Sequence, residues 1–133
     1  MDKIEQIYHK LYSSLGSQHW WPVTPKGRLH PEYSGGPKNE KQQLEVIFGA
    51  ILTQNTSWKN VEKAIAELNK SNLINIKKIL KIKNDKLAQI IKSSGYHNQK
   101  AKNLKNFCDF LLRKYNGSIK NLFQNNIKKL RKE

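Results

Sequence analysis

Every proline of this 133-residue chain lies between residues 22 and 37, in a stretch that also holds three of its glycines. Both residue types interrupt regular helices, so we expect residues 16–41 to form an irregular loop. On either side of the loop, apolar residues recur every three or four positions, which is the spacing of one helix face. No segment shows the sustained alternation typical of a β-strand. The sequence therefore predicts an all-α fold.

The predicted helices are short, and most begin or end at a residue typical of a helix cap. The first covers residues 3–15, carries an apolar stripe that includes Ile4, Ile7 and Leu11, and ends at Gly16. Further helices are expected at residues 42–53 and 57–69, near 76–82, from a cap at Asn84 to Gly95, from Asn98 to Tyr115, and in short pieces beyond. We expect one helical domain over residues 1–133, made of the helix 1–15, the loop 16–41 and a bundle over 42–133.

The charge of the chain is one-sided, with 25 Lys and Arg against 10 Asp and Glu, a net charge of +15. Such a charge indicates an anionic partner, most simply a nucleic acid. The basic residues are spread along the chain instead of lining one amphipathic helix, so we expect no membrane partner. The absence of a long apolar run or a signal-peptide pattern predicts a cytoplasmic protein. The alternative is that the lysines only keep a solvated surface soluble.

Three polar clusters interrupt the helical pattern: His19-Trp-Trp-Pro22, Gln54-Asn-Thr56, and the stretch from Gly95 to Lys100. Each one brings amides, hydroxyls or aromatic rings to the start of a helix, where free backbone N–H groups attract phosphate oxygens. Amide side chains can fill the space left by a displaced base, and aromatic rings can stack on bases. From composition alone, the amides could equally only cap helices and the tryptophans only cover the core.

No metal site or cofactor is expected. The four histidines are scattered, and the only cysteine, Cys108, has no Cys or His partner at ligand spacing. Cys108 is instead predicted to be a small core residue.

The order of these motifs resembles the endonuclease III superfamily, the helix-hairpin-helix (Gly/Pro/Asp) DNA glycosylases. The motif His19-Trp-Trp-Pro22 comes first. It is followed by a segment that ends in Leu52-Thr-Gln-Asn-Thr56, and then by Ser94-Gly-Tyr-His-Asn-Gln-Lys-Ala-Lys102. The order is most similar to the endonuclease III-like 3-methyladenine DNA glycosylases. The resemblance runs over residues 20–130 or so and is specific because three motifs occur in the family's order.

The resemblance implies that the chain binds double-stranded DNA and an alkylated purine base swung out of the duplex. Trp20 and Trp21 would form one wall of the base pocket, and Trp58 would stack on the base from the other side. Gln54 or Asn55 would enter the duplex where the base has left; the sequence does not decide between them.

The resemblance also implies that Asn98, Lys100 and Lys102 bind backbone phosphates and so set position rather than sequence. It further implies an incomplete six-helix barrel that lacks the helix-hairpin-helix, because this motif should begin just after Leu130. The family's catalytic aspartate, and the lysine of its lyase members, follow that motif. We therefore assign no catalytic residue and expect no excision by this chain alone.

Two functions stay open. One is the N-terminal part of a base-excision DNA glycosylase, whose N-glycosidic hydrolysis needs a C-terminal half; the other is a non-catalytic basic nucleic-acid-binding module. In the first case, the stripe of the first helix and the inner faces of the helices that contain Leu52 and Leu111 should lack cover. We then expect the chain to pair with a complementing C-terminal fragment or with a second copy of itself.

Overall fold

The computed structural model describes residues 1–19 and 21–132. Over these residues it contains helices and a single antiparallel bridge between Val23 and Glu32, with no β-strand, so the predicted all-α fold is confirmed. The elements are α1 (Lys3–Leu15), α2 (Glu40–Leu52), α3 (Trp58–Lys70), α4 (Ile76–Lys81), α5 (Asn84–Ile90), the 3₁₀ turn η1 (Lys92–Ser94), α6 (His97–Tyr115), α7 (Ile119–Phe123) and α8 (Ile127–Leu130).

Helix caps explain where these limits differ from the prediction. Helix α2 begins two residues earlier than expected, because the side chain of Asn39 accepts a hydrogen bond from the Gln42 N–H at 2.9 Å. The predicted cap Asn84 is instead the first residue of α5, and Lys83 takes the cap position. The irregular loop therefore ends at residue 39 instead of 41.

The two ends of α6 differ in how well the sequence predicted them. The helix begins at His97, one residue before the predicted start at Asn98, after a left-handed Tyr96. It ends as predicted, because Asn116 and Gly117 both adopt positive φ values, of 54° and 75°. Gly95 (φ 68°) closes the short turn η1 that follows α5, not α5 itself.

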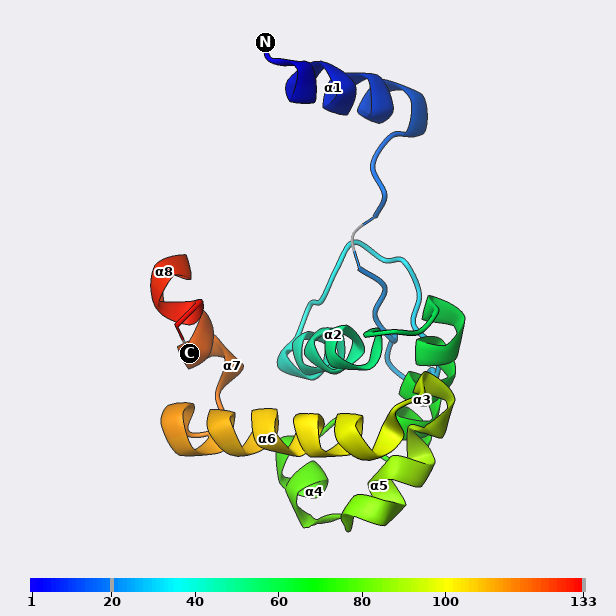
Figure 1. Ribbon diagram of the computed structural model, residues 1–133, viewed down its shortest axis with the longest axis vertical. Coiled ribbons are helices and arrows are strands. Elements are labelled where there is room, and N and C mark those ends of the chain that lie inside the picture. Colours follow the sequence, from blue (N-terminus) through cyan, green and yellow to red (C-terminus); the bar gives the residue numbers. More distant parts are fainter. Residues whose placement is uncertain (20, 133) are drawn as a thin grey trace.

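Helices α2 to α7 surround one apolar core, and α6 lies between α2 on one side and the α4–α5 pair on the other (Figure 1). Leu52 of α2 and Leu111 of α6 are both fully buried in this core. The prediction that the inner faces of these helices lack cover is therefore wrong at these residues. Cys108 is also fully buried, and burial raises the pKa of its thiol to about 12, as suits a core residue.

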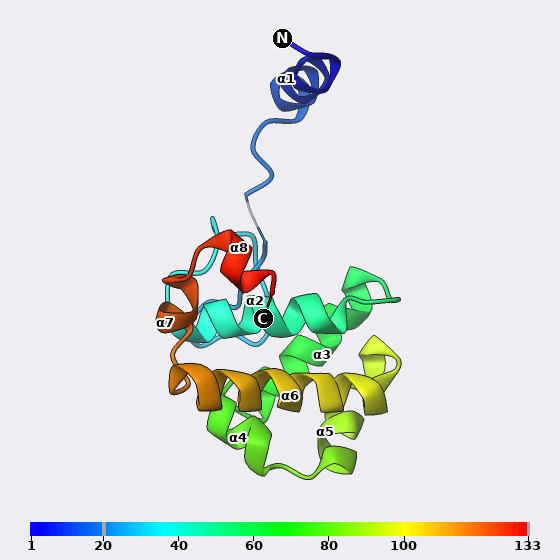
Figure 2. The ribbon, with the colours of Figure 1, turned by 60° about the vertical axis from the view of Figure 1, so that its left-hand side comes forward.

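Helix α1 stands apart from the bundle in both views (Figures 1 and 2). None of its residues is buried, and its large apolar side chains are between 54% and 77% exposed. An Asp2–Glu5 capping box nevertheless fixes its start. The expectation that the apolar stripe of this helix lacks cover is confirmed. None of the described helices is both long and apolar enough to span a lipid bilayer.

The irregular loop is held to the bundle by one buried carboxylate, that of Glu45 on α2. Glu45 Oε1 accepts hydrogen bonds from the Thr24 N–H (2.7 Å) and the Thr24 hydroxyl (2.9 Å). Its other oxygen accepts from the Asn69 amide of α3 at 3.3 Å. Burial raises the pKa of Glu45, while the hydrogen bonds from Thr24 and Asn69 act against this. The loop is thereby fixed against both α2 and α3.

The raised pKa of Glu45 predicts a pH-dependent stability. The folded protein holds the Glu45 proton to a higher pH than the unfolded chain, whose pKa is near 4.5. The stability that this proton contributes is complete below that pH and is lost as the pH rises through the folded-state pKa. A Glu45→Gln variant cannot titrate there. We expect the free energy of unfolding of wild type minus that of Glu45→Gln, measured by urea denaturation, to decrease from pH 4.5 towards neutrality.

The matched control is Glu40→Gln, which neutralises an exposed carboxylate in the first turn of the same helix. The same difference in the free energy of unfolding, measured for Glu40→Gln, shows how much of the pH dependence comes from replacing any carboxylate of α2 by an amide. A Glu45→Gln difference that stays constant with pH, or grows as the pH rises, would contradict the assignment.

Candidate nucleic-acid interface

The turn between α2 and α3 and the turn between η1 and α6 lie side by side at one end of the bundle (Figures 1 and 2). The ammonium group of Lys100 joins them. Its Nζ donates hydrogen bonds to the carbonyl of Leu52, the last residue of α2, at 2.8 Å, and to the carbonyl of Ser94, the last residue of η1, at 2.6 Å. We call this pair of turns the Lys100 junction.

Lys100 was predicted to bind a backbone phosphate, and the structure gives it a different role. Its side chain is only 3% exposed, and the two carbonyls take up its ammonium group. Burial also lowers its pKa. Sequence alone could not separate this lysine from its exposed neighbour Lys102, because the partners of Lys100 include a residue 48 positions away.

A second contact strengthens the junction at the first turn of α3. The Ser93 hydroxyl donates to the carbonyl of Asn60 at 3.0 Å, and the Asn60 amide donates to the Thr56 hydroxyl at 3.1 Å. The start of α3 is therefore tied both to η1 and to the turn that precedes it.

The junction presents amides and one aromatic ring to solvent. Gln54 and Asn55 are exposed, and Asn55 has a φ of 56°, a left-handed conformation that asparagine tolerates. Tyr96 is 71% exposed and also left-handed, with φ 44° and ψ 38°. This conformation is strained for a bulky residue, and such strain is concentrated at functional sites. The sequence indicated this turn but did not single out Tyr96; an aromatic residue after Gly95 at a helix start was the available signal.

Both helices that start at the junction lack a side-chain cap. Ser57, at the cap position of α3, and Tyr96, at that of α6, make no capping hydrogen bond with their side chains. Ser57 occupies the cap position of α3 only with its backbone. Uncapped N–H groups and the positive end of a helix dipole favour an anion. Asn98 and Lys102 are both exposed in the first two turns of α6.

Trp21 and Trp58 lie next to the junction. Trp20 lies outside the described residues. The ring of Trp21 packs over α2 at Gly49, where an added Cβ would lie 3.4 Å from Trp21 Nε1. Trp58 is the first residue of α3, and its ring meets that of Trp21 edge to face, with centroids 5.4 Å apart at 84°. A base stacked between two rings needs about 7 Å, twice a van der Waals contact. Trp21 and Trp58 thus form one partly exposed surface and do not face each other across a gap.

Loss of the Lys100 hydrogen bonds should destabilise the fold. A Lys100→Met variant keeps the apolar stem but leaves two carbonyls without their donor, at about 1–3 kcal/mol each. We expect the free energy of unfolding, measured by urea denaturation, to fall by roughly 2–6 kcal/mol. Lys102→Met, at an exposed position of the same helix, should change it by less than about 0.5 kcal/mol. Equal effects of the two substitutions would show that the junction does not depend on this ammonium group.

Comparison with known proteins gives three matches. The family model described as HhH-GPD superfamily base excision DNA repair protein matches residues 48–131. The protein MJ1434 of Methanocaldococcus jannaschii, which bears the name of a DNA repair glycosylase, is 42% identical over 118 residues, covering 86% of this chain and 46% of that protein. The crystal structure of H. pylori 3-methyladenine DNA glycosylase (MagIII) bound to 1,N6-ethenoadenine superposes with a TM-score of 0.68 and 26% identity, covering 96% of this chain and 54% of that one.

The chain thus spans about half the length of these two relatives. The matched residues include both turns of the Lys100 junction and run to residue 131, so the family model matches this part of the chain although we expected it to lack the helix-hairpin-helix. The all-α bundle corresponds to part of the MagIII glycosylase fold. The predicted family resemblance is confirmed, and the chain belongs to the HhH-GPD superfamily of base excision DNA repair proteins.

Proposed function

We propose that this chain is the part of a base-excision DNA glycosylase that binds duplex DNA and receives a displaced, alkylated purine base. The Lys100 junction is the observation that carries this proposal, because it places two uncapped helix starts, two exposed amides and a strained exposed tyrosine at one end of the bundle. The net charge of +15 supports an anionic partner, and MagIII was crystallised with a modified adenine.

The DNA backbone would be held by the starts of α3 and α6. Their free N–H groups are suited to phosphate oxygens, and the exposed side chains of Asn98 and Lys102 add a polar and a cationic contact. Lys100 does not take part in this contact, because its ammonium is committed to the junction. These contacts set the position of the protein on the duplex without reading sequence.

The space left by the displaced base would be filled from the junction. Gln54 and Asn55 are both exposed and within one turn, so either amide can enter the duplex. Tyr96 projects from the neighbouring turn and can stack on an adjacent base, at about 1–3 kcal/mol. This stacking would offset much of the few kcal/mol that unstacking a base costs.

The displaced base would lie against the Trp21–Trp58 surface and not between the two rings, which are in contact. An alkylated purine is electron-poor and can be cationic, and indole faces attract cations by about 0.5–2 kcal/mol. Trp20, which lies outside the described residues, stays part of the aromatic set proposed from the family resemblance. The lesion class is thus set by ring stacking and charge.

N-glycosidic hydrolysis would need residues from the part of the relatives that this chain does not match. The exposed stripe of α1 is a surface that such a segment, or a second copy of this chain, would cover. Each large apolar side chain that becomes buried there contributes about 1.5–3 kcal/mol. The chain itself would bind the lesion without excising it.

Binding to damaged DNA tests the role of the junction. We expect wild type to prefer a duplex with one 1,N6-ethenoadenine over the same duplex without it, in a fluorescence anisotropy titration. Tyr96→Ala should weaken binding to the damaged duplex by roughly 5- to 150-fold, which corresponds to the loss of one stacking contact. Its effect on the undamaged duplex should be much smaller.

Lys102→Ala is the matched control, because loss of a phosphate contact should weaken both duplexes by the same factor. Circular dichroism confirms that each variant is folded. If Tyr96→Ala also weakens both duplexes equally, or wild type shows no preference, the chain is a general nucleic-acid-binding module and the pocket proposal fails.

A complementation experiment tests whether this chain supplies lesion binding while the unmatched part of its relatives supplies the catalytic residues. We expect excision of ethenoadenine when this chain is mixed with the segment of MagIII that it does not match, and none from either piece alone. Replacing Ile7 and Leu11 by Ser should abolish the activity of the mixture, since both side chains lie in the exposed stripe. Lys10→Ser, a polar position of α1, should preserve it. An inactive mixture of two folded pieces would contradict this division.

A further inference from the structure

A groove with a cavity volume of about 700 Å³ lies between α3 and α5, and residues 29 and 30 of the irregular loop form one of its rims. We call it the α3–α5 groove. None of the described residues assigned above to DNA or base binding lines it. Its size is that of a ligand-binding cleft, which spans about 300–1,000 Å³.

The loop rim of the groove is fixed in place. The Asn69 amide on α3 donates a hydrogen bond to the carbonyl of Leu29 at 3.1 Å, and the same amide contacts the buried Glu45. His30 Nδ1 lies 3.7 Å from Glu62 Oε1 of α3, which joins the next loop residue to the helix. The groove is therefore part of the folded framework and does not depend on a free loop.

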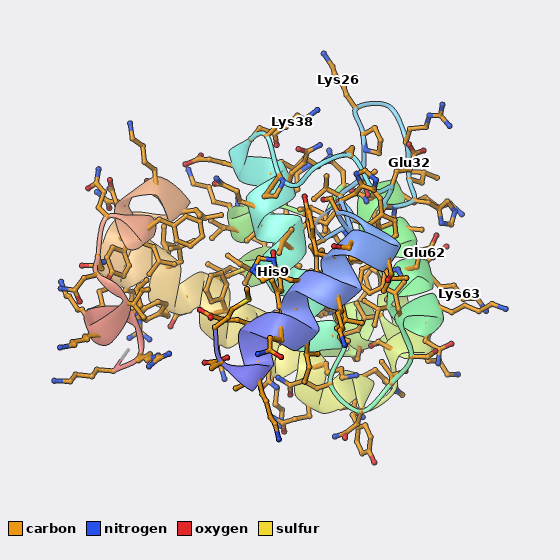
Figure 3. All side chains as sticks on the ribbon, turned by 90° about the horizontal axis from the view of Figure 1, so that it is seen from above. His9, Lys26, Glu32, Lys38, Glu62 and Lys63 are labelled. Carbon is orange, nitrogen blue, oxygen red and sulfur yellow. The ribbon has the colours of Figure 1, made fainter. Side chains whose placement is uncertain are left out.

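The walls of the groove are basic and its surface has an apolar strip. Lys63 and Lys70 of α3 and Lys86 of α5 are all exposed, and Figure 3 shows Lys63 extending outward from its helix. Among the described residues, Glu67 is the one carboxylate that lines it. The apolar strip is formed by Leu29, which is 44% exposed, with Ala66 and Ile90.

These features exclude the simplest occupants. A nucleic-acid backbone would bring its phosphates towards the Glu67 carboxylate, which lines the groove. A second copy of the chain would bring only a surface of net charge +15 to these lysines, so it is not the occupant of this groove. No segment of this chain fits either, since its ten acidic residues are dispersed and no two of them are adjacent.

We propose that the α3–α5 groove binds an acidic segment of a partner protein, whose carboxylates pair with Lys63, Lys70 and Lys86 while its apolar side chains rest on Leu29, Ala66 and Ile90. Opposite charges along the rims guide association, and the apolar contacts hold the complex. Such a partner would reach Ser93 at the edge of the junction but would not cover Gln54, Asn55 or Tyr96, none of which lines the groove. The proposal is independent of the proposed function.

The test uses a fluorescein-labelled peptide in which glutamate and leucine alternate, and a second one in which serine replaces leucine at equal charge. We expect saturable binding of the Glu–Leu peptide to the full chain by anisotropy, about tenfold tighter than that of the Glu–Ser peptide. Lys70→Glu and Lys86→Glu should each weaken it roughly tenfold. Leu29→Ser should reduce the difference between the two peptides.

The control is Lys77→Glu, which makes the same charge change at an exposed lysine of α4 outside the groove and should leave peptide affinity within about twofold. Duplex DNA affinity should fall equally for the groove variants and for this control. Three results would overturn the proposal: no saturable peptide binding, equal binding of both peptides, or a selective loss of DNA affinity in the groove variants. The last would identify the groove as a second DNA contact.

Discussion

The hydrogen bonds of one buried ammonium group, that of Lys100, set the geometry on which the proposed interface depends. Removing a charged amine from water is costly, and here two carbonyls at the ends of α2 and η1 offset that cost. Because those carbonyls belong to two different turns, the same contact fixes the spacing of the turns. The exposed groups that they carry are thereby presented together, before any DNA is bound.

A second buried charge plays the corresponding role for the irregular loop. Glu45 gathers Thr24 and Asn69 around one carboxylate and so holds non-helical backbone against α2 and α3. Lys100 and Glu45 are both ionisable and almost fully buried, and each one hydrogen-bonds to a residue far away in the sequence. Apolar packing builds the bundle, and these polar contacts place the segments around it that carry the candidate binding surfaces.

Three surfaces with different chemistry result. The Lys100 junction offers amides, an aromatic ring and helix starts, which suit a nucleic acid; the α3–α5 groove combines basic walls with an apolar strip; and α1 exposes an apolar stripe. The apolar stripe of α1 consists of side chains that are more than half exposed, and an exposed apolar surface of this kind is typical of an interaction site. In the proposed division of the enzyme, the α1 stripe is the surface on which a further segment would dock.

The sequence by itself determined the helices and the family, because helix formation follows local apolar spacing and caps, and the motifs lie in short contiguous segments. It identified the stripe of α1 and the stop at Asn116 correctly. Only the tertiary structure decided that Lys100 is buried while Lys102 is exposed. It also decided that the rings of Trp21 and Trp58 are in contact and that the side chain of Tyr96 is exposed to solvent. These features depend on which distant residues meet when the bundle closes, and local periodicity carries no information about such pairings.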